Sequence, residues 1–170
     1  MDKKMSKYYL AYGSNLSMAQ MAGRCHDAVY VGTAEIVDYQ LLFKGSRTGS
    51  YLTIEPKDGK TVPVFVWRIS DRDERNLDRY EGCPEFYYKR EVTVEMKSMQ
   101  DGIPVGKIDA LVYIMHEARS LGCPTLRYYE VCLEGYRRFG FPSSILEQAL
   151  RNSVGKRRGN AMLKEAGYYD

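Results

Sequence analysis

The segment "TVPVFVWRIS", Thr61 to Ser70, decides the fold class. Apolar side chains occupy both of its faces, with Val62, Val64 and Val66 on one and Phe65, Trp67 and Ile69 on the other. A strand with two apolar faces is buried on both sides. We therefore expect this strand to run through the middle of a closed or covered sheet.

Other strand patterns lie on either side of this segment. Residues 7–12, 34–44, 51–56, 87–97 and 107–115 all have strand-like composition or alternation. The sequence "KDGK" predicts a turn between 51–56 and 61–70. The Gly-containing loop "QDGIPVG" predicts that 87–97 and 107–115 form a long antiparallel hairpin.

Helical patterns separate and follow the strands. Residues 70–82 begin with Ser70 as the expected N-cap and end with Gly82 as the expected C′ glycine. Residues 124–141 and 143–152 have amphipathic helical spacing. These elements predict an α+β fold, a small, mixed, mostly antiparallel β-barrel with flanking short helices. We expect residues 1–170 to be a single domain, with a core at about 7–152 and a basic C-terminal tail at 153–170.

Composition limits the classes of partner. The 170 residues are 44% hydrophobic and 28% charged, with a net charge of +3, as is typical of a soluble globular protein. That charge is too small to indicate nucleic acid, and no segment approaches the roughly 20 apolar residues of a membrane span. The sequence predicts a cytoplasmic protein without a nucleic-acid or membrane partner. The 15 tyrosines leave a homodimer possible, because they could line either an interface or a cavity.

The cysteines and histidines of the sequence argue against a metal site and against a Ser-His-Asp catalytic triad. Cys25, Cys83, Cys123 and Cys132 are widely spaced and contain no C-x-x-C pair, so we expect free and mostly buried thiols. The adjacent Cys25 and His26 are interpreted as structural, because neighbouring residues alone are a weak metal signal. We predict neither a metal nor a cofactor.

The turn "YGSN" follows the first strand pattern and has two interpretations. Gly13 can adopt a positive φ, while Ser14 and Asn15 are natural caps for the short helix expected after them. Backbone N–H groups that converge at such a turn form an anion site for a carboxylate or an oxyanion. The alternative is an ordinary capped turn between strand and helix, which spacing alone favours.

Glu81 also has two interpretations. It falls at the end of the helix predicted at 70–82, where the negative end of the helix dipole disfavours a carboxylate and raises its pKa. Four neighbouring side chains could raise that pKa further if they desolvate the group: Tyr80, Cys83, Phe86 and Tyr87. Such a carboxyl suits a general base at neutral pH. The alternative is a solvent-exposed glutamate that happens to end a helix.

Four motifs in order resemble the gamma-glutamylcyclotransferase family. They are "YGSNL", the "YEG" that ends the mid-chain helix, "YKREVTV" and "PTLRYYEVCLEGYRRFGFP", and they cover roughly residues 8–150. The resemblance implies a small barrel with one cavity and no cofactor. It implies that Glu81 is the acid/base and that the gamma-glutamyl group is held by Tyr12, Gly13, Ser14, Asn15, Leu16 and Tyr128. Thr125 stands where the family usually has serine.

The resemblance also implies a reaction. The amine of a gamma-glutamyl group attacks its own side-chain carbonyl, which forms 5-oxoproline and releases an amine or amino acid. Loops such as 45–51 and 83–88 would select the released group, and Arg47 is interpreted as a solvated loop residue. Two alternatives remain open: an inactive binding or scaffold module of this fold, and, more weakly, a nucleic-acid-associated protein that uses Lys156, Arg157 and Arg158.

Overall fold

The computed structural model describes residues 5–46 and 49–167. The strands are β1 (Met5–Ala11), β2 (Val29–Ser46), β3 (Gly49–Ser70), β4 (Tyr87–Ser98), β5 (Pro104–Met115) and β6 (Ser120–Leu121). The helices are the 3₁₀ turn η1 (Ser14–Leu16), α1 (Met18–Arg24), α2 (Asp71–Tyr80), α3 (Leu126–Arg138), α4 (Ser143–Val154) and α5 (Lys156–Glu165).

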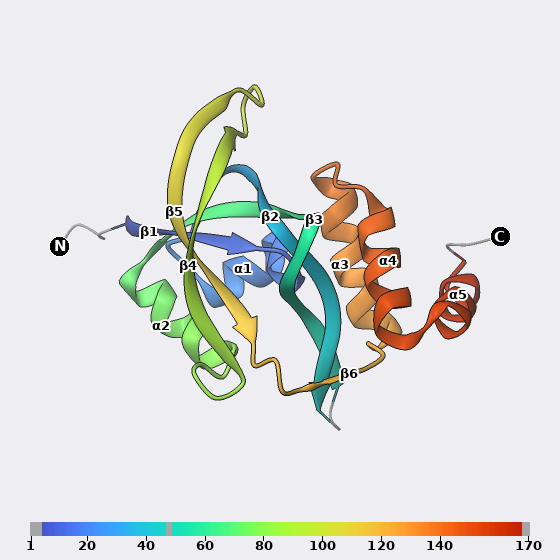
Figure 1. The fold of residues 1–170 in the computed structure, drawn as a ribbon. Helices are drawn as coiled ribbons and strands as arrows, with labels where there is room; N and C mark the ends of the chain where they lie inside the picture. Colours follow the sequence, from blue (N-terminus) through green and yellow to red (C-terminus); the bar gives the residue numbers. More distant parts are fainter. Residues whose placement is uncertain (1–4, 47–48, 168–170) are drawn as a thin grey trace.

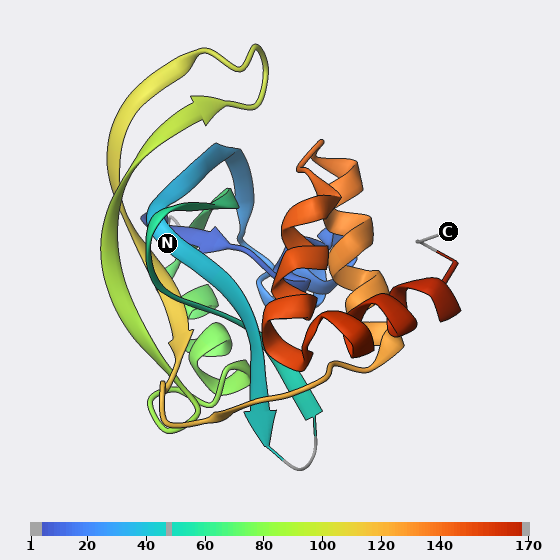
Figure 2. The same ribbon diagram turned by 45° about the vertical axis from the view of Figure 1, so that its right-hand side comes forward.

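The strands close into a barrel. Their order is β3-β1-β5-β4-β2, and β2 pairs back onto β3 to complete the circle. β1 and β5 pair in parallel, whereas the other described pairings are antiparallel. α2 lies on one side of the barrel and the α3–α4 pair on the other (Figures 1 and 2). The predicted α+β fold with a small, mixed, mostly antiparallel barrel is confirmed.

The second half of β3 is the core strand that its two apolar faces predict. Val64, Phe65 and Val66 have no exposed surface, and Trp67 keeps only 3%. β1 pairs with this half of β3 on one edge and β2 pairs on the other, so both faces and both edges are covered. Closure of the barrel is what buries both faces.

The turn predicted at "KDGK" is wrong. β3 is one strand of 22 residues, and both of its halves pair with β2, since Tyr39 lies opposite Pro56 and Val37 opposite Thr61. The extra residues are taken up in an irregularity opposite Asp38, which has a φ of 62° and accepts a 2.9 Å hydrogen bond from the Gly59 N–H. Because both halves share one partner strand, a bulge replaces the turn.

The predicted helices form at the expected places. α2 starts with a reciprocal capping box between Ser70 and Asp73, and Gly82 follows the helix with a φ of +60°. The predicted hairpin of β4 and β5 is also present, paired from Tyr87 with Met115 to Lys97 with Pro104.

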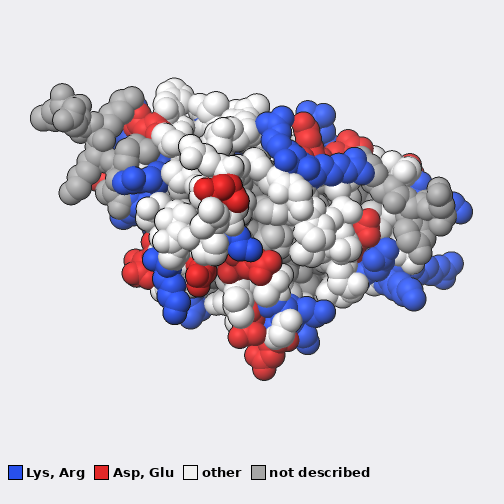
Figure 3. Space-filling view, turned by 90° about the horizontal axis from the view of Figure 1, so that it is seen from above, with Lys and Arg blue, Asp and Glu red and all other residues white. Residues whose placement is uncertain are grey.

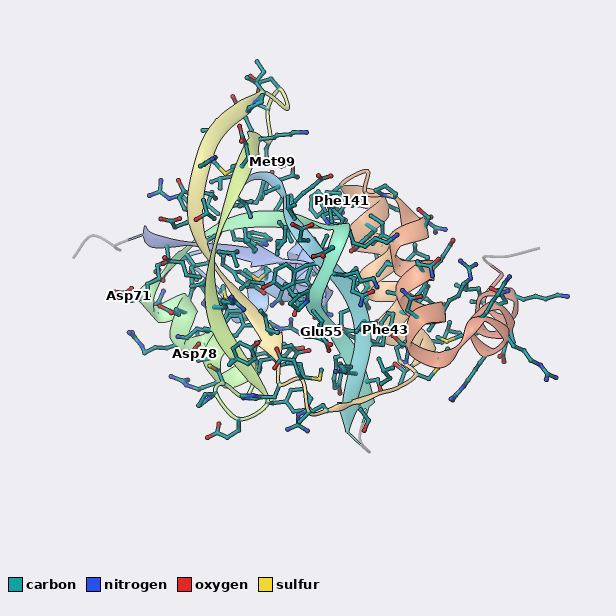
Figure 4. The ribbon with its side chains drawn as sticks, in the orientation of Figure 1. Phe43, Glu55, Asp71, Asp78, Met99 and Phe141 are labelled. Carbon is teal, nitrogen blue, oxygen red and sulfur yellow. The ribbon has the colours of Figure 1, made fainter. Side chains whose placement is uncertain are left out.

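α3 and α4 cover one face of the barrel. Phe43, labelled in Figure 4, extends from β2, with its ring 6.1 Å from that of Tyr129 on α3. Its backbone N–H donates to Ser153 Oγ of α4 at 2.8 Å. Within the predicted basic tail, Lys156–Glu165 form the helix α5. Leu163 of this helix is buried, whereas Lys156, Arg157 and Arg158 are exposed.

Positive and negative side chains are mixed over the face seen in Figure 3. Across the described ranges, none of the helices has the length and apolar character needed to cross a membrane. All four cysteines are free thiols, two of them buried (Cys25 and Cys132) and two half-buried (Cys83 and Cys123).

Candidate active site

A cavity of about 380 Å³ lies where β1 ends. Its wall is formed by the turn after β1, by β3, β4 and β5, by the C-terminal end of α2 and by the first turn of α3. The volume lies within the range of small-molecule sites. These segments are far apart in the sequence and meet because the barrel closes.

Most of the predicted site residues face this cavity. Its lining includes Glu81 and the residues Tyr12, Gly13, Ser14, Asn15 and Tyr128. Leu16 is not in the lining, because it is fully buried against Gly135 of α3. Arg47 lies outside the described residues. The geometry therefore brings six of the seven predicted residues together and places Leu16 behind them.

The turn differs in detail from the prediction. Gly13, the N-cap of η1, has a φ of −129° and a ψ of −130° rather than a positive φ. Ser17, not Ser14 or Asn15, caps α1 through a 3.3 Å hydrogen bond from the Gln20 N–H. Gly13 instead leaves room for Tyr128, since a Cβ on Gly13 would lie 3.3 Å from the Tyr128 hydroxyl.

Two side chains of the turn are held in place. Asn15 is 3% exposed, donates to the Tyr9 hydroxyl at 2.8 Å and accepts a hydrogen bond from Arg24. Ser14 accepts a second hydrogen bond from Arg24 at 3.4 Å. The side-chain amide of Asn15 is therefore oriented by a hydrogen bond at its nitrogen, to Tyr9, and by another at its oxygen, from Arg24.

Tyrosine hydroxyls join the walls of the cavity. Tyr12 donates to the Tyr113 carbonyl at 2.5 Å, and Tyr87 donates to the Leu52 carbonyl at 2.8 Å. The Leu52 N–H donates to the Tyr128 hydroxyl at 3.1 Å. Burial raises the pKa of all four tyrosines, so they stay protonated and act as neutral hydrogen-bonding groups.

Glu81 is the carboxylate of the cavity. It is the C-cap of α2, where its N–H donates to the Leu77 carbonyl at 2.8 Å, and its side chain lines the cavity wall. Burial raises the pKa of Glu81 to about 7, and the nearby Arg24 cation opposes the rise. The predicted direction of the shift is correct, and desolvation is its largest cause.

α2 is tied to the barrel close to Glu81. Asp78, labelled in Figure 4, accepts a 2.6 Å hydrogen bond from the Tyr113 hydroxyl of β5. Asp78 also forms an ion pair with Lys89 of β4 at 3.0 Å. These contacts hold the end of the helix at the cavity.

Sequence reasoning missed several lining or supporting residues. Tyr9, Tyr51, Arg79 and Tyr113 line the cavity, and Arg24 supports it. Tyr9 and Arg79 lie within three residues of the predicted Tyr12 and Glu81. Pairing and packing with distant segments bring Tyr51, Tyr113 and Arg24 to the site, so no local spacing marks them. The aromatic composition was the available signal, and it could not separate cavity tyrosines from core or interface tyrosines.

The comparison with protein families decides what kind of chain this is. A family described as "Gamma-glutamyl cyclotransferase, AIG2-like" matches residues 9–139, which include the turn, Glu81 and Tyr128. The chain belongs to this gamma-glutamyl cyclotransferase, AIG2-like family. A search of curated proteins found no match.

Solved structures place the fold within the same family. A structure named gamma-glutamyl cyclotransferase is 25% identical, with a TM-score of 0.72, and the match covers 94% of this chain and 98% of that one. An uncharacterized protein from Homo sapiens is also 25% identical, with a TM-score of 0.69 over 86% of this chain and 87% of that one. YkqA from Bacillus subtilis, 23% identical, has a TM-score of 0.66 over 86% of this chain and 54% of that one, and supports the fold alone.

Proposed function

We propose that this family member is an active gamma-glutamyl cyclotransferase that converts a gamma-glutamyl amide or amino acid into 5-oxoproline. One observation carries the proposal. Glu81 has a pKa of about 7 and lies in the same cavity as the turn from Tyr12 to Asn15. A carboxyl with a pKa near neutrality can both accept and return a proton during one turnover. Family membership and the similarity to a structure named gamma-glutamyl cyclotransferase give further support.

The proposed reaction needs no external nucleophile. The substrate's α-ammonium loses a proton to Glu81, and the free amine attacks the carbonyl carbon of its own side chain. A new C–N bond closes the five-membered ring, and the attacking nitrogen loses a second proton as it becomes the lactam N–H. The old C–N bond breaks, and the departing nitrogen takes up two protons in all, delivered by way of Glu81, so that the amine leaves as an ammonium. Because both reacting groups belong to one molecule, the protein has mainly to fold the substrate and place the base.

The turn is proposed to stabilise the charge that develops on the carbonyl oxygen. The first N–H groups of a helical turn have no partner within it, and Gly13, Ser14 and Asn15 of the turn line the cavity. Donors aimed at a developing oxyanion stabilise a tetrahedral transition state. The neutral tyrosines around them would keep water away from the reacting groups.

Release of 5-oxoproline by wild-type and Glu81→Gln protein tests the proposal. The panel contains gamma-glutamyl amino acids, gamma-glutamylamines and gamma-glutamyl-ε-lysine. We expect turnover of at least one member by the wild type and a loss of about a hundredfold or more in Glu81→Gln, because glutamine keeps the shape and cannot accept a proton.

Glu91→Gln is the matched control. Glu91 is exposed on β4 and does not line the cavity, so its substitution should leave turnover within about twofold of wild type. Equal losses in the two variants would contradict the assignment to Glu81. Binding of a gamma-glutamyl compound without turnover of any panel member would favour the inactive binding module or a larger, carrier-bound substrate.

A further inference from the structure

Arg24, the last residue of α1, contacts two parts of the cavity wall. Its Nη1 donates to Asn15 Oδ1 and, at 3.4 Å, to Ser14 Oγ. The same guanidinium lies over the ring of Tyr80, with its carbon 3.4 Å from the ring centroid. Asn15 and Ser14 belong to the turn, whereas Tyr80 directly precedes Glu81. One side chain therefore joins the turn to the helix that carries the carboxylate.

Asn15 extends this arrangement to Tyr9. The Asn15 Nδ2 group donates to the Tyr9 hydroxyl, and an amide nitrogen can only donate, so the hydroxyl oxygen is the acceptor. The hydroxyl hydrogen of Tyr9 is then free for another acceptor, and Tyr9 lines the cavity. Burial keeps the pKa of Tyr9 above its ordinary value, so that hydrogen is retained. Arg24 thus sets, through Asn15, where a neutral donor of the cavity lies.

The charge of Arg24 acts on Glu81 as well. The titratable groups that line the cavity with Glu81 come from β1 and the following turn, β3, α2, β4, β5 and α3. They are Tyr9, Tyr12, Tyr51, Arg79, Tyr80, Tyr87, Tyr113 and Tyr128. Arg24 from α1 adds the cation that lowers the pKa of Glu81 against the larger effect of burial. Removal of Arg24 should therefore raise the pKa of Glu81.

We propose that Arg24 is a positioning residue of this site, which aligns the donors of the turn with Glu81 through Asn15 on one side and Tyr80 on the other. The expected change in turnover rests on the proposed function, whereas the contacts of Arg24 with Asn15 and Tyr80 do not. A planar guanidinium can donate to Asn15 and stack on an aromatic ring at once, and a lysine ammonium cannot reproduce both contacts. Arg24→Lys therefore keeps the charge and loses the geometry, and Arg24→Gln loses both.

Steady-state kinetics across pH test the proposal in the full chain. We expect kcat to fall about 10- to 100-fold in Arg24→Gln and in Arg24→Lys, with KM within about threefold, because misaligned groups slow the chemical step. The acid limb of kcat/KM should move to higher pH in Arg24→Gln and less in Arg24→Lys. Tyr80→Leu should lose part of kcat without moving the acid limb.

Arg75→Gln is the matched control, because Arg75 is exposed on α2 and does not line the cavity. It should keep wild-type kcat and pH dependence. Wild-type kinetics in Arg24→Gln would overturn the proposal, and so would a large rise in KM with kcat unchanged, since Arg24 would then bind substrate instead. If thermal melting shows that Arg24→Gln is unfolded, Arg24→Lys and Tyr80→Leu replace it. Wild-type kinetics in these variants, or a large rise in KM with kcat unchanged, would then overturn the proposal.

A measurement without substrate separates this inference from the proposed function. Nuclear magnetic resonance can follow the titration of the Glu81 carboxyl and the side-chain amide signals of Asn15. In Arg24→Gln we expect the Glu81 midpoint to rise by about half a pH unit or more and the Asn15 signals to shift. This titration needs no turnover, so it tests the inference even if the wild type turns over no panel member. Unchanged Glu81 and Asn15 signals in Arg24→Gln would overturn this inference.

Discussion

Two opposing influences set the pKa of Glu81. Burial destabilises its charged form, whereas Arg24 stabilises it, and the result is a pKa of about 7 in place of an ordinary value of 4.5. A fully desolvated glutamate without the arginine would hold its proton too tightly to act as a base at neutral pH. An exposed one would be too weak a base for an ammonium.

The pKa of Glu81 predicts the pH dependence of turnover. The base form is the deprotonated carboxylate, so kcat/KM should fall as pH drops below about 7 and level off above it. Wild-type kcat/KM measured from pH 5 to 9 on one substrate checks this. An acid limb with its midpoint near 4.5 would show that the essential base has the pKa of an ordinary exposed carboxyl.

At the scale of elements, the turn is held from behind by α3. Leu16 has no exposed surface, and its Cβ lies 2.6 Å from the position that a Cβ on Gly135 would occupy. α3 can approach η1 this closely only because Gly135 has no side chain. The packing of one helix therefore sets the depth of the turn that lines the cavity.

Gly135→Ala should disturb both stability and the turn. We expect the free energy of unfolding to drop by about 1–3 kcal/mol from overpacking, offset by up to about 1 kcal/mol of helix propensity. Turnover should fall as Leu16 moves. Denaturant titration and 5-oxoproline release measure the two effects.

Gly23→Ala is the control for this substitution. Gly23 lies in α1, and a Cβ there would meet nothing within 4 Å, so alanine should leave turnover unchanged and add about 0.5–1 kcal/mol of stability. If Gly135→Ala behaves like Gly23→Ala, the close contact between α3 and the turn does not control the site.

At the scale of the whole molecule, the cavity and α5 belong to different regions. Among the described residues, none from α4 or α5 lines the cavity, and α5 lies at the outer side of α4 (Figure 1). Leu163 is the apolar anchor of α5, with 1% of its surface exposed. The division into a core and a basic tail, a homodimer and a cytoplasmic location remain predictions.

Leu163→Ala should affect stability without affecting the reaction. Truncating a buried leucine typically destabilises by about 2–5 kcal/mol, and we expect the lower end here because α5 is the last helix of the chain. The melting temperature should fall by about 4–8 °C while kcat stays within twofold of wild type. Thermal melting and 5-oxoproline release check this, and a large loss of kcat would show that α5 influences the cavity.

The sequence by itself determined the features that depend on neighbouring residues. The two apolar faces of Thr61 to Ser70, the cap of α2 at Ser70 and the hairpin of β4 and β5 follow from alternation, spacing and turn chemistry within a few positions. The order of the four family motifs identified Glu81 as the candidate acid/base. The true start of α1 and the bulge opposite Asp38 depended on competing local and long-range contacts, and the sequence misplaced them.

The tertiary structure alone decided the cavity. The Tyr12 hydroxyl donates a hydrogen bond to the carbonyl of Tyr113, which is 101 positions away. The Leu52 N–H donates one to the hydroxyl of Tyr128, which is 76 positions away. Such contacts exist only once the barrel closes and α3 packs against it, because no local pattern brings residues so far apart together. Closure also places the half-buried Glu81 in the wall of the cavity, within electrostatic reach of Arg24. The pKa of this carboxyl is therefore a property of the folded barrel, and Glu81 would titrate as an ordinary glutamate without it.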